Sequence, residues 1–295
     1  MSTSTVRRFN RLHTRVLGVL DDDFLSRGRP LGASRLLFEI GDGTLVADLR
    51  DRLDLDSGYV SRLLRSLEAD DLVSTTPDPT DSRRRFVSLT DAGRRERDEL
   101  DRLSDRHVDD LLAPLDPRRR SELADVLDHA RRLLIAATVT FEDVDPSTPE
   151  ALFALRSYYG ELDATFEGGF DPGEPGADGA DYVRPRGRFV IVRIDDESER
   201  PFATVGGCGA VTRLEPGVAE IKRMWIHPEM RGLGLAGRLL RHLEDAARSD
   251  GHRRVRLDTN DALLPAIEMY RTSGYAEIDR YNDNPYARLF FEKAL

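Results

Sequence analysis

Arg231-Gly-Leu-Gly-Leu-Ala236 stands between a strand-like run over residues 218–226 and a helix-like run over residues 237–249. Small residues at positions 232, 234 and 236 let the backbone curl closely around an anion. The first-turn amides of the helix that follows have no partner within the helix and point the same way. This stretch therefore predicts a loop that binds a phosphate group at the end of a strand.

The same residues also fit the G-x-G-x-x-G pattern of dinucleotide-binding proteins, through Gly232, Gly234 and Gly237. Asp258 follows at about the distance at which such proteins place a ribose-binding acid. In a dinucleotide fold, however, the loop follows its strand directly. Residues 227–231 intervene here, and this disfavours a dinucleotide site. An ordinary glycine-rich turn is the other alternative.

Residues 220–236 resemble the acetyl-CoA loop of the GNAT N-acetyltransferases, which carries the pattern R/Q-x-x-G-x-G/A. Arg231, Gly234 and Ala236 fill that pattern. The family's second signature is an alanine, then a tyrosine, then Gly-Phe or Gly-Tyr, and it is present as Ala266, Tyr270 and Gly274-Tyr275. Many members have an asparagine seven residues before the tyrosine, where this chain has Leu263. The resemblance covers residues 138–295 and implies an α/β domain with a mixed sheet.

This resemblance implies an enzyme that transfers an acetyl group from acetyl-CoA to the amine of a small molecule. The implied cofactor-binding residues are the main-chain groups of Met224, Trp225 and Ile226 and the loop residues Arg231, Gly232, Leu233, Gly234, Leu235 and Ala236. Tyr270 matches the acid that protonates the leaving thiolate, and Glu220 is the candidate base, acting through water. Tyr270 can equally be a core aromatic, and Glu220 can form an ion pair with Lys222 or Arg223.

The acceptor pocket is expected in two polar-aromatic segments, 166–172 and 281–287. Their candidate substrate residues are Phe166, Tyr281, Asn282, Asn284 and Tyr286. The same segments can also be turns that asparagine side chains stabilise.

The N-terminal half shows helical periodicity over residues 4–25, 33–40, 45–53 and 57–69, then strand-like runs at 72–77 and 86–89 on either side of a basic turn. Within residues 57–69, Val60, Leu63, Leu64 and Leu67 form a buried stripe at helical spacing. Long helices follow at 91–112 and 118–135. The motifs at 56–68 and 81–93 resemble the MarR family of winged helix–turn–helix regulators, over residues 5–137.

This second resemblance implies a dimer that reads a pseudo-palindromic operator in double-stranded DNA. The polar face of residues 57–69 and the basic turn supply the candidate DNA-binding residues Ser57, Tyr59, Ser61, Arg62, Arg65, Arg83, Arg84 and Arg85. Arg83 can instead pair with Asp81, and Arg62 and Arg65 can be solvated surface charges.

Length and composition agree with two domains, which we place at residues 1–137 and 138–295 on either side of a strand expected over 136–142. The formal charge of −10 argues against nucleic acid only for the second part, because residues 1–141 carry 24 arginines against 26 acidic residues. A single cysteine, Cys208, excludes an internal disulfide framework, and no metal-ligand spacing is present. Without an apolar leader or a long apolar run, we expect a cytoplasmic protein with no membrane contact.

The sequence thus predicts a mainly α winged helix–turn–helix fused to an α/β GNAT domain. Its expected function is that of a bifunctional, homodimeric transcription regulator and N-acetyltransferase. The alternative is a regulator whose GNAT-like domain senses a CoA ester or a metabolite without turnover.

Overall fold

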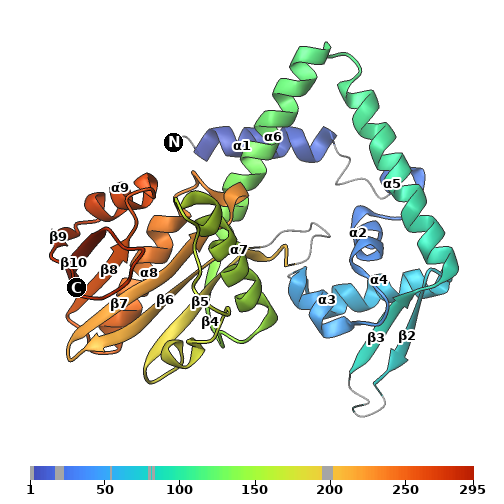
Figure 1. Cartoon of the computed structure of the whole chain (residues 1–295). Coiled ribbons are helices and arrows are strands. Elements are labelled where there is room, and N and C mark those ends of the chain that lie inside the picture. The colour runs from blue at the N-terminus through green and yellow to red at the C-terminus, as the bar shows by residue number, and fades with distance from the viewer. Residues whose placement is uncertain (1–2, 17–22, 54, 79–80, 82–83, 195–201) are drawn as a thin grey trace. The chain divides into compact units, whose positions relative to one another are not determined.

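The computed structural model describes residues 3–16, 23–53, 55–78, 81, 84–194 and 202–295 (Figure 1). The chain divides into two compact units, Met1–Ser121 and Glu122–Leu295, which we call the N-terminal unit and the C-terminal unit. This division falls within helix α6 (Pro117–Thr138). The functional boundary expected between residues 137 and 138 stays a prediction.

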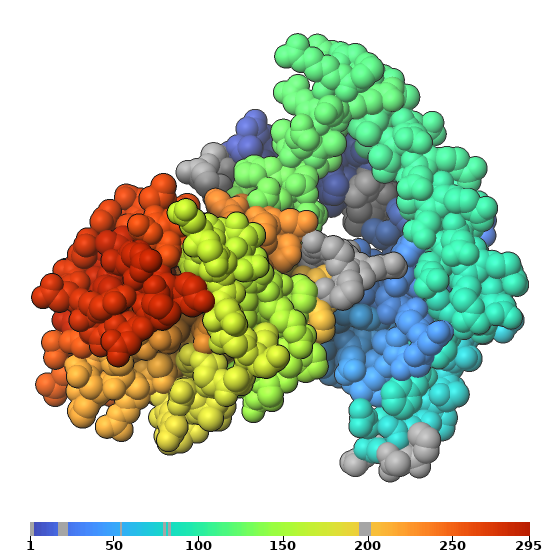
Figure 2. All heavy atoms as spheres, in the orientation of Figure 1, coloured from blue at the N-terminus to red at the C-terminus, as the bar shows by residue number. Residues whose placement is uncertain are grey.

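The N-terminal unit is a winged helix–turn–helix with a small sheet in the order β1-β3-β2. Its elements before α6 are α1 (Thr3–Val16), η1 (Phe24–Ser26), α2 (Leu31–Glu39), β1 (Thr44–Leu45), α3 (Val46–Arg52), α4 (Ser57–Ala69), β2 (Val73–Pro77), β3 (Arg85–Leu89) and α5 (Asp91–Leu112). The antiparallel β2–β3 hairpin projects from the helices as the wing (Figure 1). In Figure 2, α5 lies at the surface of this unit along its length.

Helix α4 forms as its pattern predicts. The Asp56 carboxylate caps it by accepting a hydrogen bond from the Tyr59 amide at 3.1 Å. All four members of the predicted stripe, Val60, Leu63, Leu64 and Leu67, are buried in the core of the unit. Burial of this stripe leaves the polar face of α4 in solvent.

Two sequence predictions about helix ends are wrong. The helix expected over residues 4–25 does not reach residue 25, because residues 24–26 form the short 3₁₀ turn η1 with Leu25 at a φ of 52°. The strand expected over residues 136–142 begins only at Thr140, because α6 continues through two alanines to Thr138. Alanine favours the helix over the strand, and the Thr138 hydroxyl donates back to the Ile135 carbonyl at 3.0 Å.

The C-terminal unit is built on a mixed seven-stranded sheet in the order β4-β5-β6-β7-β8-β10-β9. Its strands are β4 (Thr140–Val144), β5 (Gly187–Arg193), β6 (Val205–Glu215), β7 (Val218–Ile226), β8 (Arg254–Thr259), β9 (Ala276–Ile278) and β10 (Leu289–Ala294). Its helices besides α6 are α7 (Pro149–Thr165), η2 (Gly179–Tyr182), η3 (Pro228–Met230), α8 (Leu235–Ser249) and α9 (Leu264–Thr272). Only β7 and β8 pair in parallel among the described strands.

Both faces of this sheet are covered. Along β5, Phe189 and Ile191 join the core under α7, whereas Val190 and Val192 join the core under α8 and α9. Strands buried on both faces are continuous apolar runs, as residues 189–192 are. The loop expected to be exposed over residues 168–187 is wrong in part, because η2 places Tyr182 in the α7 core at 5% exposure.

Candidate active site

The centre of the sheet opens between β7 and β8. Their parallel pairing covers only residues 218–220 of β7 and 254–256 of β8, although β7 runs on to Ile226 and β8 to Thr259. On its other side β7 carries a bulge, because Cys208 pairs with Trp225 but Ala210 pairs with Lys222. Arg223, inside this bulge, has a φ of 59°, and the ladder is disrupted there. The parted strands and the bulge make room for two cavities.

The first cavity, which we call the loop-side cavity, has a volume of about 430 Å³. It extends from the β7 bulge to the start of α8 and lies against α7 and α9. Its lining includes nearly all of the predicted cofactor-binding residues: Met224, Trp225, Ile226, Arg231, Gly232, Gly234, Leu235 and Ala236. Leu233 is absent from this lining and packs against the apolar core instead.

Two glycines shape the predicted anion loop. Gly232 and Gly234 have φ values of 77° and 76°, and no atom lies within 4 Å of where a Cβ would stand on either. The left-handed conformation favours glycine, and the open space leaves the loop accessible. Helix α8 begins at Leu235, two residues before the predicted start, so Leu235 and Ala236 belong to its first turn. The main-chain amides in the first turn of α8 have no partner within the helix, and they lie at the end of the helix that meets this cavity.

Arg231 lies at the loop with its guanidinium already engaged. Its Nε donates to the Ile226 carbonyl at 3.0 Å, and its Nη2 forms an ion pair with Glu161. Glu161 also accepts a hydrogen bond from the Trp225 indole at 2.9 Å. Arg231 thus fixes the loop against β7 and α7, and its charge is partly neutralised by Glu161.

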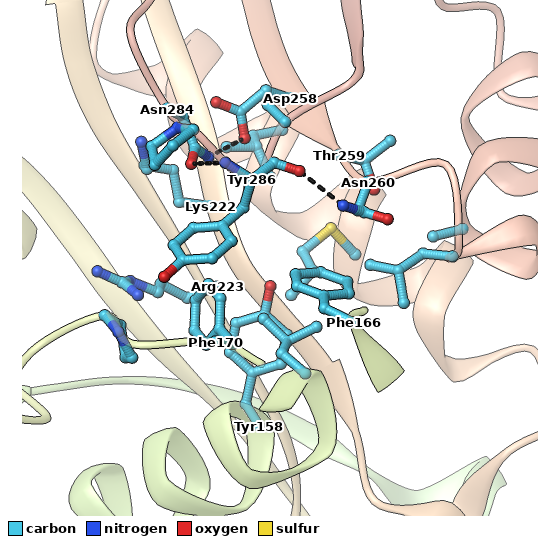
Figure 3. A pocket seen from close by; sticks show the side chains of 18 of the residues that line it. Tyr158, Phe166, Phe170, Lys222, Arg223, Asp258, Thr259, Asn260, Asn284 and Tyr286 are labelled. Carbon is cyan, nitrogen blue, oxygen red and sulfur yellow. Dashed lines mark hydrogen bonds between the residues drawn. The ribbon is translucent and has the colours of Figure 1, made fainter. Parts of the chain in front are cut away.

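The second cavity, which we call the aromatic cavity, has a volume of about 370 Å³ (Figure 3). It shares Tyr270 with the loop-side cavity. Three of the predicted substrate residues, Phe166, Asn284 and Tyr286, line it. The rings of Phe170 and Tyr286 meet with centroids 4.7 Å apart. The wall therefore combines aromatic faces with amide and carboxylate groups.

Tyr270 lines both cavities and is 7% exposed. Its hydroxyl lies 4.0 Å from the Met224 sulfur, and Met224 also lines both cavities. Burial, with a smaller contribution from the Asp258 carboxylate, raises the pKa of Tyr270 above its ordinary value. The phenol thus keeps its proton at neutral pH, at the wall that the cavities share.

Glu220 lies apart from both cavities. The residue is 6% exposed. Three donors surround its carboxylate: the Tyr281 hydroxyl at 2.8 Å, the Asn282 amide at 3.2 Å and the Lys222 ammonium at 3.2 Å. Tyr281 and Asn282, which were expected in the acceptor pocket, likewise lie behind the cavity wall. The ion pair with Lys222 is the alternative that the sequence had left open.

The lining of the aromatic cavity also includes residues outside the two expected segments: Tyr158, Lys222, Arg223, Asp258 and Asn260. Phe170 and Asp171, which line it too, belong to the expected segment 166–172. The sequence indicated Asp258 only as the ribose-binding acid of the dinucleotide alternative. Residues 254, 256 and 258 alternate along β8 and share one face, but this period of two gives only the face of the strand and does not place Asp258 beside a cavity.

On the N-terminal unit, the candidate DNA-binding residues Ser57, Tyr59, Ser61, Arg62 and Arg65 are all exposed on α4. Arg62 lies over the Tyr59 ring at 5.9 Å. On the wing, Arg84 lies 4.0 Å from Asp78, and Arg85 hydrogen-bonds to Thr75. Arg83 lies outside the described residues.

Comparison with known proteins agrees with this geometry. Residues 155–275 match the family model described as the acetyltransferase (GNAT) family. An uncharacterized N-acetyltransferase of Schizosaccharomyces pombe is 33% identical over 111 residues, which are 37% of this chain and 64% of that protein. The IAA acetyltransferase of Azospirillum brasilense is 37% identical over 118 residues, which are 38% of this chain and 71% of that protein.

The chain belongs to the GNAT acetyltransferase family. Its GNAT domain is fused to a winged-helix domain, since residues 36–93 match a model described as a winged helix DNA-binding domain. Solved structures that resemble the N-terminal unit include a MarR-family regulator from Rhodococcus, at 22% identity and a TM-score of 0.35. That similarity covers 43% of this chain and 95% of the regulator.

Two kinds of feature are absent from the described residues. No described helix has the length and apolar character needed to cross a membrane. The same part of the chain holds no group of three or more His, Cys, Asp or Glu residues arranged to bind a metal ion.

Proposed function

We propose that the C-terminal unit transfers an acetyl group from acetyl-CoA to the amine of a small molecule, and that the N-terminal unit binds double-stranded DNA. The observation that carries the first part is the position of Tyr270 and Met224 between two cavities. One of these cavities opens on an anion-binding helix terminus, and the other is enclosed by aromatic and polar side chains. We keep the boundary between the two activities at residues 137 and 138.

The residues at the loop-side cavity fit acetyl-CoA. Gly232, Gly234 and the first turn of α8 offer main-chain donors to a diphosphate. The disrupted ladder at Arg223 and Met224 offers main-chain groups where an oxyanion would develop. When bound, acetyl-CoA supplies a thioester carbonyl carbon that bonds to the amine nitrogen while its C–S bond breaks.

Tyr270 holds a proton at its phenolic oxygen, and we assign that proton to the departing thiolate. The acceptor must in turn lose a proton, because an ammonium nitrogen has no lone pair. Glu220 was expected to take this proton through water, and since its carboxylate lies outside both cavities, such a role would need that water or another intervening group.

Titration of the protein with acetyl-CoA in a calorimeter tests the proposed cofactor site. We expect saturable binding, and we expect Gly234→Glu to abolish it because a carboxylate would enter the anion loop. Gly217→Glu is the matched control, since Gly217 also has a left-handed φ of 80° with no atom within 4 Å of its Cβ position, but lies outside both cavities. Equal binding by wild type and Gly234→Glu would contradict the assignment.

Turnover separates the enzyme from its alternative. Release of free CoA thiol with a panel of primary amines would support acetyl transfer. Tight acetyl-CoA binding without release for any amine would favour a regulator that only senses the CoA ester.

For the N-terminal unit, we propose that α4 enters a DNA groove and that a homodimer places two copies of α4 on a pseudo-palindromic operator. The exposed polar face of α4 supports the first part. Large apolar side chains left exposed on the long helices support the second: Val6, Phe9 and Leu12 on α1, Val108 and Leu111 on α5, and Val126, Leu127, Leu133 and Leu134 on α6. Such side chains are commonly covered by a partner chain.

A further inference from the structure

The charges that line the aromatic cavity do not cancel. Its two cations are compensated by carboxylates outside the lining, since Lys222 pairs with Glu220 at 3.2 Å and Arg223 pairs with Asp178 at 2.5 Å. Its two carboxylates, Asp258 and Asp171, have no ion-pair partner within the part of the chain that the structure describes. The cavity therefore presents negative charge to whatever enters it.

Asp258 and Asp171 differ in their surroundings. Asp171 is exposed, so water and salt screen its charge. Asp258 is half-buried, and two neutral donors fix its carboxylate: the Asn282 amide at 2.6 Å and the Asn284 amide at 3.2 Å. Figure 3 shows the second of these hydrogen bonds. A charge pair formed at Asp258 would thus be the stronger of the two.

Glu220 and Asp258 are held by the same asparagine. The Asn282 amide donates to Glu220 at 3.2 Å and to Asp258 at 2.6 Å, but only Asp258 lines the cavity. Both carboxylates accept hydrogen bonds from side chains, so the lining of the cavity decides between them, and Asp258 is the one that an acceptor can reach.

We propose that Asp258 binds the ammonium group of the acceptor and takes its proton, and that the aromatic cavity selects a primary amine with a ring-sized apolar body and no carboxylate. This inference rests on the proposed acetyl transfer. The proton leaves the ammonium for the Asp258 carboxylate, and the freed nitrogen lone pair forms the C–N bond. Phe166, Phe170 and Tyr286 supply the faces on which the apolar body packs, with centroid separations of 4.7 Å to 6.1 Å. A carboxylate on the acceptor is disfavoured because Arg223 is already neutralised by Asp178.

Binding of three matched probes to the full chain tests this proposal without turnover. The probes are 2-phenylethylamine, the neutral 2-phenylethanol and the anionic 3-phenylpropionate, each titrated by calorimetry or ligand-observed NMR. We expect the wild type to bind the amine about 10- to 100-fold more tightly than the alcohol, as for a hydrogen bond to a charged group, and the acid most weakly. Asp258→Asn should remove the preference for the amine, whereas Asp171→Asn should keep most of it.

Acetyl-CoA affinity of Asp258→Asn reports whether the fold is intact, because Asp258 does not line the loop-side cavity. A wild type without preference for the amine, or an Asp258→Asn variant that keeps the preference, would overturn the proposal. The outcomes also separate the two levels of inference. If only Asp258→Asn loses the preference for the amine and no amine is acetylated, the proposed acetyl transfer is refuted while the amine-binding site is supported.

Discussion

In the N-terminal unit the candidate contact residues of α4 are exposed to solvent, whereas in the C-terminal unit the candidate acid, Tyr270, is 7% exposed. Arg62 has a full charge in a medium of high dielectric constant, where salt weakens each interaction. Tyr270 is neutral and desolvated, where a single proton transfer has a large effect. The same chain thus uses many weak contacts in one unit and a few enclosed groups in the other.

This difference predicts how each unit responds to single substitutions. A surface that binds through several contacts loses only part of its affinity when one is removed. A cavity with one acid loses most of its activity with that acid.

The largest effect is expected for Tyr270→Phe. Loss of the proton donor should lower kcat by about 100- to 10,000-fold, while the affinity for acetyl-CoA stays within about twofold. Steady-state kinetics with any accepted amine, together with calorimetry, measure both quantities. Tyr158→Phe is the matched comparison because Tyr158 lines the same two cavities. A larger fall in kcat for Tyr158→Phe than for Tyr270→Phe would assign the acid to Tyr158.

Local features of the chain and features built from distant segments differ in how far the sequence predicted them. The stripe on α4 and the glycines at 232 and 234 are local features, set by periodicity and by backbone conformation within a few residues. Both were therefore predictable, and the buried stripe is confirmed. The aromatic cavity instead gathers α7, β8 and the loops at 166–172 and 284–287, which meet only through the order of the sheet.

Glu220 illustrates the limit. Its position on β7 and its residue type fit a base, but the residues that surround it, Tyr281 and Asn282, lie 61 and 62 positions away in the sequence. No periodicity within β7 indicates that they cover it. For the same reason, the sequence does not place the neighbouring Asp258 at the cavity, since that position depends on β8 lying beside the parted end of β7.

A second prediction concerns a buried charge in the N-terminal unit, where the candidate DNA-binding side chains of α4 are exposed. Glu96 on α5 is 8% exposed and accepts hydrogen bonds from Arg27 at 2.9 Å and from Arg29 at 2.5 Å. Glu96→Gln removes the carboxylate that Arg27 and Arg29 share and leaves Arg29 only the Asp70 carboxylate at 3.5 Å among the described residues, so we expect it to destabilise this unit by about 3 kcal/mol. Chemical denaturation followed by circular dichroism measures the change, and a loss below about 0.5 kcal/mol would place this pair with ordinary surface pairs.

The pH dependence of that stability follows from the same contacts. The hydrogen bond from Arg27 lowers the pKa of Glu96, outweighing the effect of burial, and the Arg29 charge lowers it further. A carboxyl whose pKa is depressed by folding stabilises the fold above its unfolded pKa of about 4.3 and loses that contribution as pH falls through the folded value. The wild type should therefore lose more stability than Glu96→Gln as pH is lowered through this range.

The smallest effect is expected on the DNA-binding surface. Arg62 has no carboxylate partner among the described residues, so its charge is available to a phosphate, whereas Arg84 lies 4.0 Å from Asp78. For a randomised duplex pool, Arg62→Ala should lower the slope of log affinity against log salt by about 1, and Arg84→Ala should lower it less. Arg254→Ala, which removes an exposed arginine from the C-terminal unit, controls for net charge. Fluorescence anisotropy over a salt series gives the slopes. Equal slopes for all three variants and the wild type would mean that the exposed face of α4 does not contact DNA, and the contrast between a charged surface and an enclosed cavity would then describe the fold without describing its function.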